Sequence, residues 1–99
     1  MSKIEYNNIG SYIREQREKF KLPLRKLAAE LDIDTSTLSK IEKGERQANL
    51  DMIPVLAKVF KIDFKELQIR FLSDKLVHDY RKEEFVVESF KEAIKKLDK

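Results

Sequence analysis

Apolar residues recur along most of this chain at intervals of three and four positions, which is the spacing of one face of an α-helix. No stretch alternates apolar and polar residues over the length of a strand, and glycine and proline are scarce, with two of each. The pattern predicts an all-α protein of six helices joined by short turns. Their approximate ranges are 9–20, 23–31, 35–43, 50–60, 64–71 and 73–97.

Residues at the expected helix ends support these ranges. Asn7 or Asn8 suits the N-cap of the first helix, and Pro23 suits the first position of the second, where its missing N–H loses no hydrogen bond. Pro54 lies too far inside the fourth helix for an undisturbed start and predicts a kink or a late beginning. The remaining expected caps are Asp34 and Gly44 around the third helix, Asn49 for the fourth, Asp63 with Glu66 for the fifth and Ser73 for the sixth.

The second and third predicted helices form a pair joined by the tight turn 32–34. Ala28 offers a small side chain where two helices must approach closely, while the third helix has only Leu38 and Ile41 as large apolar residues. Most of the third helix therefore faces outward. Such a pair suits DNA, because the first helix lies across the backbone and the second places its exposed face in the major groove. The residues expected to hold the pair together are Leu27, Ala28, Leu31, Ile33, Leu38 and Ile41.

Composition narrows the class of protein. Apolar residues make up 41% and charged residues 39% of the chain, which is typical of a folded domain with a highly hydrated surface. Cysteine is absent and His78 is the only histidine, so disulfides and thiolate metal sites are excluded, and no metal or cofactor is expected. The sequence has no apolar run of about 18 residues and no signal-peptide pattern at its N-terminus. We therefore expect a cytoplasmic protein without a membrane partner.

The net charge of +3 is modest but unevenly placed. Residues 72–99 carry seven basic and seven acidic side chains, so the whole excess lies in residues 1–71. Within that part, residues 14–26 carry six basic and two acidic side chains. The total charge alone does not indicate nucleic acid as the partner; the distribution indicates a local positive face on the first two-thirds of the chain.

Four short signatures in this region follow one another at a characteristic spacing. They are Leu27-Ala28, Ile33 in the turn, the run 39–44 (Ser-Lys-Ile-Glu-Lys-Gly) and Leu56-Ala57. Together they resemble the Cro/phage-repressor family of helix-turn-helix proteins, also called the xenobiotic-response-element family, over about residues 9–67. The resemblance implies a five-helix, lambda-repressor-like domain that binds double-stranded operator DNA, usually as a homodimer.

The resemblance also implies roles for matching positions of this chain. Thr35 and Ser36 correspond to the start of the recognition helix and Lys40 to a later outward position, so these side chains are expected to reach base edges. Lysine donates to O6 and N7 of guanine, and hydroxyls both donate and accept. The expected base-reading set is Thr35, Ser36, Ser39 and Lys40; the expected phosphate contacts are Leu24 through its backbone N–H, Arg25, Lys26, Thr37, Lys43 and Arg46.

Two positions depart from the family's pattern and two match it. Many members carry glutamine where this chain has Leu24 and proline where it has Ala48, so the side chain at position 24 cannot bind a phosphate as that glutamine does. Arg17 and Glu42 match an arginine and a glutamate that commonly pair in the family. We expect them to form a partly buried ion pair that holds the first helix on the third.

The chain beyond Phe71 carries a separate pattern. Its apolar residues predict a helix that packs on another helix, with a bend near residues 81–84. We therefore divide the chain into a DNA-binding domain, 1–71, and a C-terminal amphipathic helix, 72–99. That helix either packs on its own domain or, in our main interpretation, joins two protomers. The residues expected at a dimer interface are Leu76, Tyr80, Val87, Phe90, Ile94 and Leu97.

The main functional hypothesis is a sequence-specific transcriptional regulator that binds a two-fold operator as a homodimer. Small proteins of this kind resemble controllers of restriction–modification systems, phage-type repressors or antitoxins. The alternative is a protein-interaction module that keeps the helix-turn-helix fold without reading DNA sequence. An enzyme is not expected, because the sequence has no nucleophile–base–acid set, metal cluster or glycine-rich phosphate loop, and no small-molecule ligand is evident.

Overall fold

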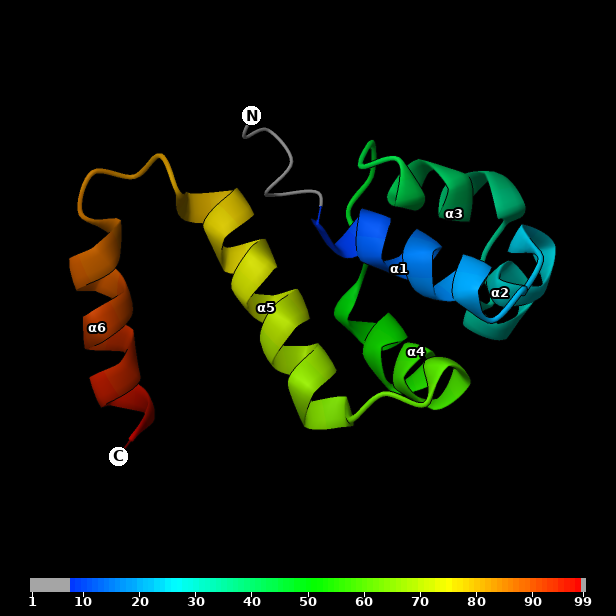
Figure 1. The fold of residues 1–99 in the computed structure, drawn as a ribbon. Coiled ribbons are helices and arrows are strands. Elements are labelled where there is room, and N and C mark those ends of the chain that lie inside the picture. The colour runs from blue at the N-terminus through cyan, green and yellow to red at the C-terminus, as the bar shows by residue number, and fades with distance from the viewer. Residues whose placement is uncertain (1–7, 99) are drawn as a thin grey trace.

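The computed structural model describes residues 8–98, and all of the regular secondary structure in that range is helical (Figure 1). The predicted all-α class is therefore confirmed. The caps predicted at Asn7 and Asn8 lie outside the described residues and side chains. The elements are α1 (Asn8–Lys19), α2 (Leu24–Leu31), α3 (Thr35–Glu42), the 3₁₀ turn η2 (Leu50–Met52), α4 (Ile53–Phe60), α5 (Phe64–Tyr80) and α6 (Val86–Leu97).

The hydrophobic core lies between α1, α2, α3, α4 and the first half of α5. Each of these helices contributes apolar side chains at helical spacing, as the pattern predicts, and α6 contributes none. Gly10 allows α1 to cross the end of α3 closely, since an added Cβ would overlap the backbone oxygen of Ile41. The buried apolar residues are Ile13, Leu27, Ala28, Leu38, Ile41, Met52, Ile53, Leu56, Ala57, Phe60, Leu67 and Phe71.

The ends of the short helices follow the expected turn chemistry only in part. Asp34 precedes α3 and Asn49 precedes η2, but neither side chain makes the expected capping hydrogen bond. Pro23 is the residue before α2 rather than its first residue. Asp32 ends α2 in the left-handed conformation, with φ of 59°, and Gly44 follows α3 with φ of 81°. Pro54 is the second residue of α4, which begins late, after the turn η2, as its proline predicts. The carboxylate of Asp63 accepts a hydrogen bond from the backbone N–H of Glu66 at 3.1 Å and so caps α5.

The predicted boundary between the last two helices is wrong. Instead of ending at Phe71, α5 continues through Ser73 to Tyr80, and the hydroxyl of Ser73 donates to the backbone oxygen of Arg70 within the helix rather than capping a new one. The bend predicted near 81–84 is a break, because this run of four charged residues has no apolar side chain to pack. The expected single helix 73–97 is therefore two helices.

The cause of this error is that α5 has two apolar faces. Leu67 and Phe71 point into the core and are almost fully buried, whereas Ile69, Leu76 and Tyr80 lie on another face and are exposed. Residues on the second face are out of phase with the first, so the sequence pattern suggested a new helix where the same helix continues.

The last helix stands apart from the core. Figure 1 shows α6 beyond α5, at the opposite end of the molecule from α2 and α3, and α6 buries no residue. None of the helices in the described range has the length and hydrophobicity of a membrane span.

Candidate nucleic-acid interface

The third helix is held through one face only. Its buried side chains Leu38 and Ile41 are at most 2% exposed and pack into the core beside Leu27 and Ala28 of α2. The half-buried Ile33 in the turn packs against the same core. These contacts determine how α3 sits on α1 and α2, and Figure 1 shows its other side at the edge of the molecule.

The polar residues predicted to read bases lie together on that outer side. Thr35, Ser36 and Lys40 are exposed and Ser39 is half-buried. At roughly 100° per residue, these four positions span an arc of about 140°, so they lie on one side of the helix. The structure therefore places the four predicted base-reading residues on one accessible surface.

The residues predicted to contact phosphate divide into two groups. Arg25, Lys26, Lys43 and Arg46 are exposed, and Thr37 is half-buried. Leu24 differs from them, because its side chain is half-buried and packs against the core. Its backbone N–H lies in the first turn of α2, where amides have no helical acceptor. Any contact of Leu24 with an anion would thus be made by the backbone.

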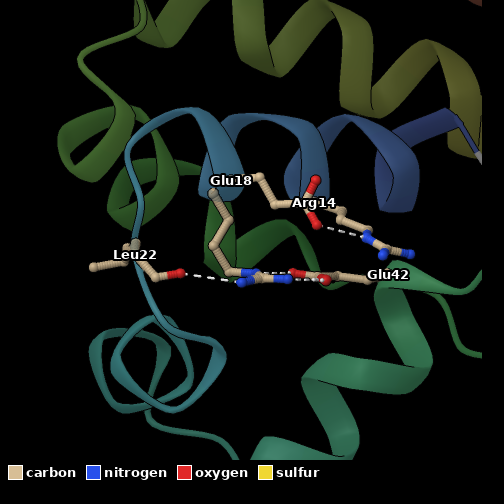
Figure 2. Close-up of polar contacts among 5 residues, drawn as sticks. Arg14, Glu18, Leu22 and Glu42 are labelled. Atoms are coloured by element: carbon tan, nitrogen blue, oxygen red, sulfur yellow. Dashed lines mark hydrogen bonds and ion pairs between the residues drawn. The ribbon is translucent and has the colours of Figure 1, made fainter.

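An ion pair between Arg17 and Glu42 joins α1 to the end of α3. The guanidinium donates from Nε to Oε2 at 2.8 Å and from Nη2 to Oε1 at 3.1 Å, while Nη1 donates to the backbone oxygen of Leu22 at 3.0 Å. Figure 2 shows these bonds running in a row between Leu22 and Glu42. The hydrogen bonds to Glu42 raise the pKa of Arg17. The expected pair is present, and it also holds the turn between α1 and α2.

A second arginine–glutamate pair lies in the open on α1. Arg14 donates from Nε to Glu18 at 3.1 Å (Figure 2), and both side chains are more than half exposed. Solvent screens a pair of this kind, whereas the Glu42 side chain is only 5% exposed. The two pairs differ in burial, and we expect only the inner one to matter strongly for the fold.

A polar cluster that the sequence did not predict connects the segment after α3 to α5. The amide oxygen of Gln47 accepts from Nζ of Lys75 at 3.2 Å, and its amide nitrogen donates to Oδ1 of Asp79 at 3.3 Å. Lys75 also donates to Oδ2 of Asp79 at 3.2 Å. The bonds from Lys75 and then Gln47 lower the pKa of Asp79. No local signal marks this cluster, because its partners are 28 and 32 residues apart.

A cavity of about 70 Å³ lies between this segment, the start of α1 and the middle of α5. Ile9, Ile41 and Phe71 supply apolar wall, and Asp74 supplies a carboxylate. Oδ2 of Asp74 is buried and has no hydrogen-bond partner among the described residues. Burial raises the pKa of Asp74, although the nearby charge of Arg70 opposes the change. Within residues 8–98, no group of three or more histidine and acidic side chains is arranged to hold a metal ion.

The residues predicted for a dimer interface remain uncovered in the single chain. Leu76 and Tyr80 lie on the outer face of α5, and Val87, Phe90, Ile94 and Leu97 lie on α6. Phe90 is half-buried and the others are exposed, up to 83% for Leu97. Because the chain is not helical at 81–85, these residues lie in two stripes on two separate helices rather than along the single bent helix expected.

Comparison with known proteins places these features in a family. The profile of the helix-turn-helix family matches residues 13–67, more than half of the chain. Two uncharacterised HTH-type transcriptional regulators of Mycobacterium tuberculosis, from strains CDC 1551/Oshkosh and H37Rv, are each 33% identical over 61 residues. The match covers 62% of this chain and 44% of each relative, so the chain spans less than half of their length. No solved structure matches significantly. With its buried α2–α3 scaffold and exposed third helix, the chain belongs to the XRE-type helix-turn-helix family.

Proposed function

We propose that this protein is a sequence-specific DNA-binding transcriptional regulator that inserts α3 into the major groove. The observation that carries the proposal is the division of α3, whose apolar face is buried while Thr35, Ser36 and Lys40 are exposed on the other. Membership of the helix-turn-helix family and the names of the two relatives support it. Such a regulator works in the cytoplasm, where it meets its operator.

Specificity and affinity come from different residues in this proposal. Thr35, Ser36, Ser39 and Lys40 read base edges, whereas contacts with phosphate position the helix. The exposed cations that precede and follow α3 in the sequence are suited to contact phosphates beside the groove. The proposed phosphate contacts are Arg25, Lys26, Lys43, Arg46, the hydroxyl of Thr37 and the backbone N–H of Leu24.

Two protomers bind a two-fold operator, with their third helices about one DNA turn, roughly 34 Å, apart. The support for a dimer is the uncovered apolar surface of α5 and α6. Monomeric proteins rarely leave contiguous apolar surface exposed to water, and such surface marks an interaction site. The surface of a second copy offers the same apolar residues and closes the assembly by two-fold symmetry. Leu76, Tyr80 and Ile94 are central to this proposed interface.

The genes next to the coding sequence would distinguish two more specific regulatory roles. A methyltransferase gene next to the coding sequence would favour a restriction–modification controller, and phage genes would favour a phage-type repressor. We propose these two as the roles to test first, because neighbouring genes can distinguish them directly.

The decisive experiment is selection of bound duplexes from random DNA by the whole protein. We expect a two-fold motif to be enriched, and the Lys40→Ala variant to lose preference at one base pair per half-site by about 1–3 kcal/mol while still binding DNA. Lys65→Ala is the control, since Lys65 is exposed in the first turn of α5. Figure 1 shows that end of α5 on the other side of the domain from α3. Equal affinity for all sequences would overturn the proposal and favour the protein-interaction module.

A further inference from the structure

We propose that Gln47 is a positioning residue, which holds the segment after the recognition helix in place so that Arg46 meets a DNA phosphate. We call its bonds with Lys75 and Asp79 the Gln47 clamp. The inference rests on the proposed DNA binding, because it concerns how one of the proposed phosphate contacts is presented. It assigns a role to three residues that lie outside the four short signatures of the sequence.

The clamp uses both ends of the Gln47 amide. The oxygen accepts from Lys75 and the nitrogen donates to Asp79, while Lys75 and Asp79 bond to each other, so the three side chains close a ring. Each of the three residues therefore makes two of the ring's contacts. A ring of this kind restrains the Gln47 side chain more than a single exposed hydrogen bond does, because releasing the amide breaks two bonds at once.

The middle of segment 44–49 depends on the clamp because its other supports lie at the two ends. At the start, the backbone N–H groups of Gly44 and Glu45 donate to carbonyl oxygens of α3 at 3.1 and 2.9 Å. At the end, Ala48 packs against the core. Between these points the segment lies over the cavity of about 70 Å³, and Arg46 and Gln47 are exposed. Arg46 and Gln47 themselves line this cavity, so the middle of the segment has little packing beneath it.

The anchor on α5 is suited to this task. Lys75 and Asp79 are one helical turn apart and paired, so the anchor does not depend on a long flexible side chain alone. The lowered pKa of Asp79 agrees with a carboxylate that stays ionised and keeps accepting both bonds. Lys75 and Asp79 directly precede Leu76 and Tyr80, so the same turns of α5 carry the clamp and part of the proposed dimer surface.

The first test is the salt dependence of DNA binding, measured with the whole protein and one duplex taken from the selection. The magnitude of the slope of log K against log salt falls by about 0.9 for each phosphate that the protein no longer neutralises. We expect Arg46→Ala and Gln47→Ala each to lower it by about that amount, and the double variant to lower it no further. Gln68→Ala, which removes the same side chain from an exposed position on α5, should leave the slope unchanged.

The second test needs no DNA. Trypsin cleaves after Arg46 when the segment opens, and mass spectrometry identifies that product among the others. We expect Asp79→Ala, which breaks the clamp without changing the residues beside the cleaved bond, to increase the rate of this cleavage by about two- to ten-fold, the range expected when exposed hydrogen bonds are removed. Gln68→Ala should be cleaved there at the rate of the wild type.

The outcomes separate the clamp from the proposed function. An unchanged salt slope in either Gln47→Ala or Arg46→Ala, in a protein that binds DNA, overturns the positioning role. An unchanged rate of cleavage after Arg46 in Asp79→Ala overturns the clamp itself. If the wild type shows no salt-dependent DNA binding, the proposed function fails, and the cleavage rate alone decides whether Gln47 holds the segment.

Discussion

Two regions of this protein are built from helices of similar amphipathic pattern, but their apolar side chains differ in how far they are buried. Helices α1 to α4 and the first half of α5 cover one another, and leave Leu27 and Leu38 with no exposed surface. The second half of α5 and α6 carry stripes of the same kind, yet Ile94 is 58% exposed and no residue of α6 is fully buried. An apolar stripe therefore shows that a helix needs a partner, and the fold determines whether the partner is in the same chain.

The same contrast appears among the charged residues. In the covered region the Glu42 carboxylate is buried and accepts two bonds from one arginine, whereas the Arg14–Glu18 pair on the surface is open to solvent. In both comparisons, the contribution of a residue to stability depends on its burial and not on its type. Burial matters because it strengthens apolar contacts and makes an unpaired charge costly.

The largest difference between the two regions should be the loss of stability when one leucine from each is replaced by alanine. Leu38→Ala should destabilise the protein by about 3–5 kcal/mol, since it leaves a cavity in a fully packed core. Leu97→Ala should change stability by less than about 0.5 kcal/mol, because that side chain is 83% exposed. Urea unfolding at low protein concentration, where protomers are separate, measures both. Equal losses would show that α6 is covered within the single chain.

Matched glutamates provide the next comparison. Glu42→Ala should destabilise by about 3 kcal/mol, because it leaves the charge of Arg17, whose side chain is 15% exposed, without its partner. Glu18→Ala removes an exposed pair and should change stability by less than about 0.5 kcal/mol. Thermal unfolding of the two variants side by side checks this. If Glu42→Ala were as mild as Glu18→Ala, the inner pair would not hold α1 on α3.

A third experiment asks whether a second copy covers the open region. Ile94→Asp should weaken self-association at least about ten-fold, since it places a carboxylate in the middle of the proposed apolar interface. Lys95→Asp introduces the same side chain at the next position, on the polar face of α6, and should have a much smaller effect. Sedimentation equilibrium gives both dissociation constants. An unchanged association in Ile94→Asp would remove α6 from the interface.

The smallest expected effect concerns Asp74, at the border of the two regions. Burial raises its pKa in the folded protein above the unfolded value, so its ionised form opposes folding. This penalty is absent below the unfolded pKa and grows as pH rises through the folded pKa. Asp74→Asn should therefore be slightly more stable than the wild type at pH 7, by less than about 1 kcal/mol, and the difference should disappear near pH 3. Unfolding at both pH values tests the sign.

The sequence allowed the covered region to be predicted closely because its signals are local. Ala28, the turn at Asp32 and the stop at Gly44 lie within one short stretch, and each acts through neighbours a few residues away. The pairing of Arg17 with Glu42 is a long-range contact, and only the resemblance to a family suggested it. The division of the chain at residue 71 stays a prediction, although the helix that crosses that point is continuous.

The sequence by itself determined that the protein is helical, where most helices begin and end, and which face of α3 is left polar. Only the tertiary structure decided that α5 runs past Phe71, that Gln47 meets Lys75 and Asp79, and that Gly10 lies against Ile41. The physical reason is range. Helix periodicity and capping depend on residues a few positions apart. The contacts of Gln47 and Gly10, and the choice of which face of α5 the core covers, depend instead on how whole helices pack, which no single stretch of sequence encodes.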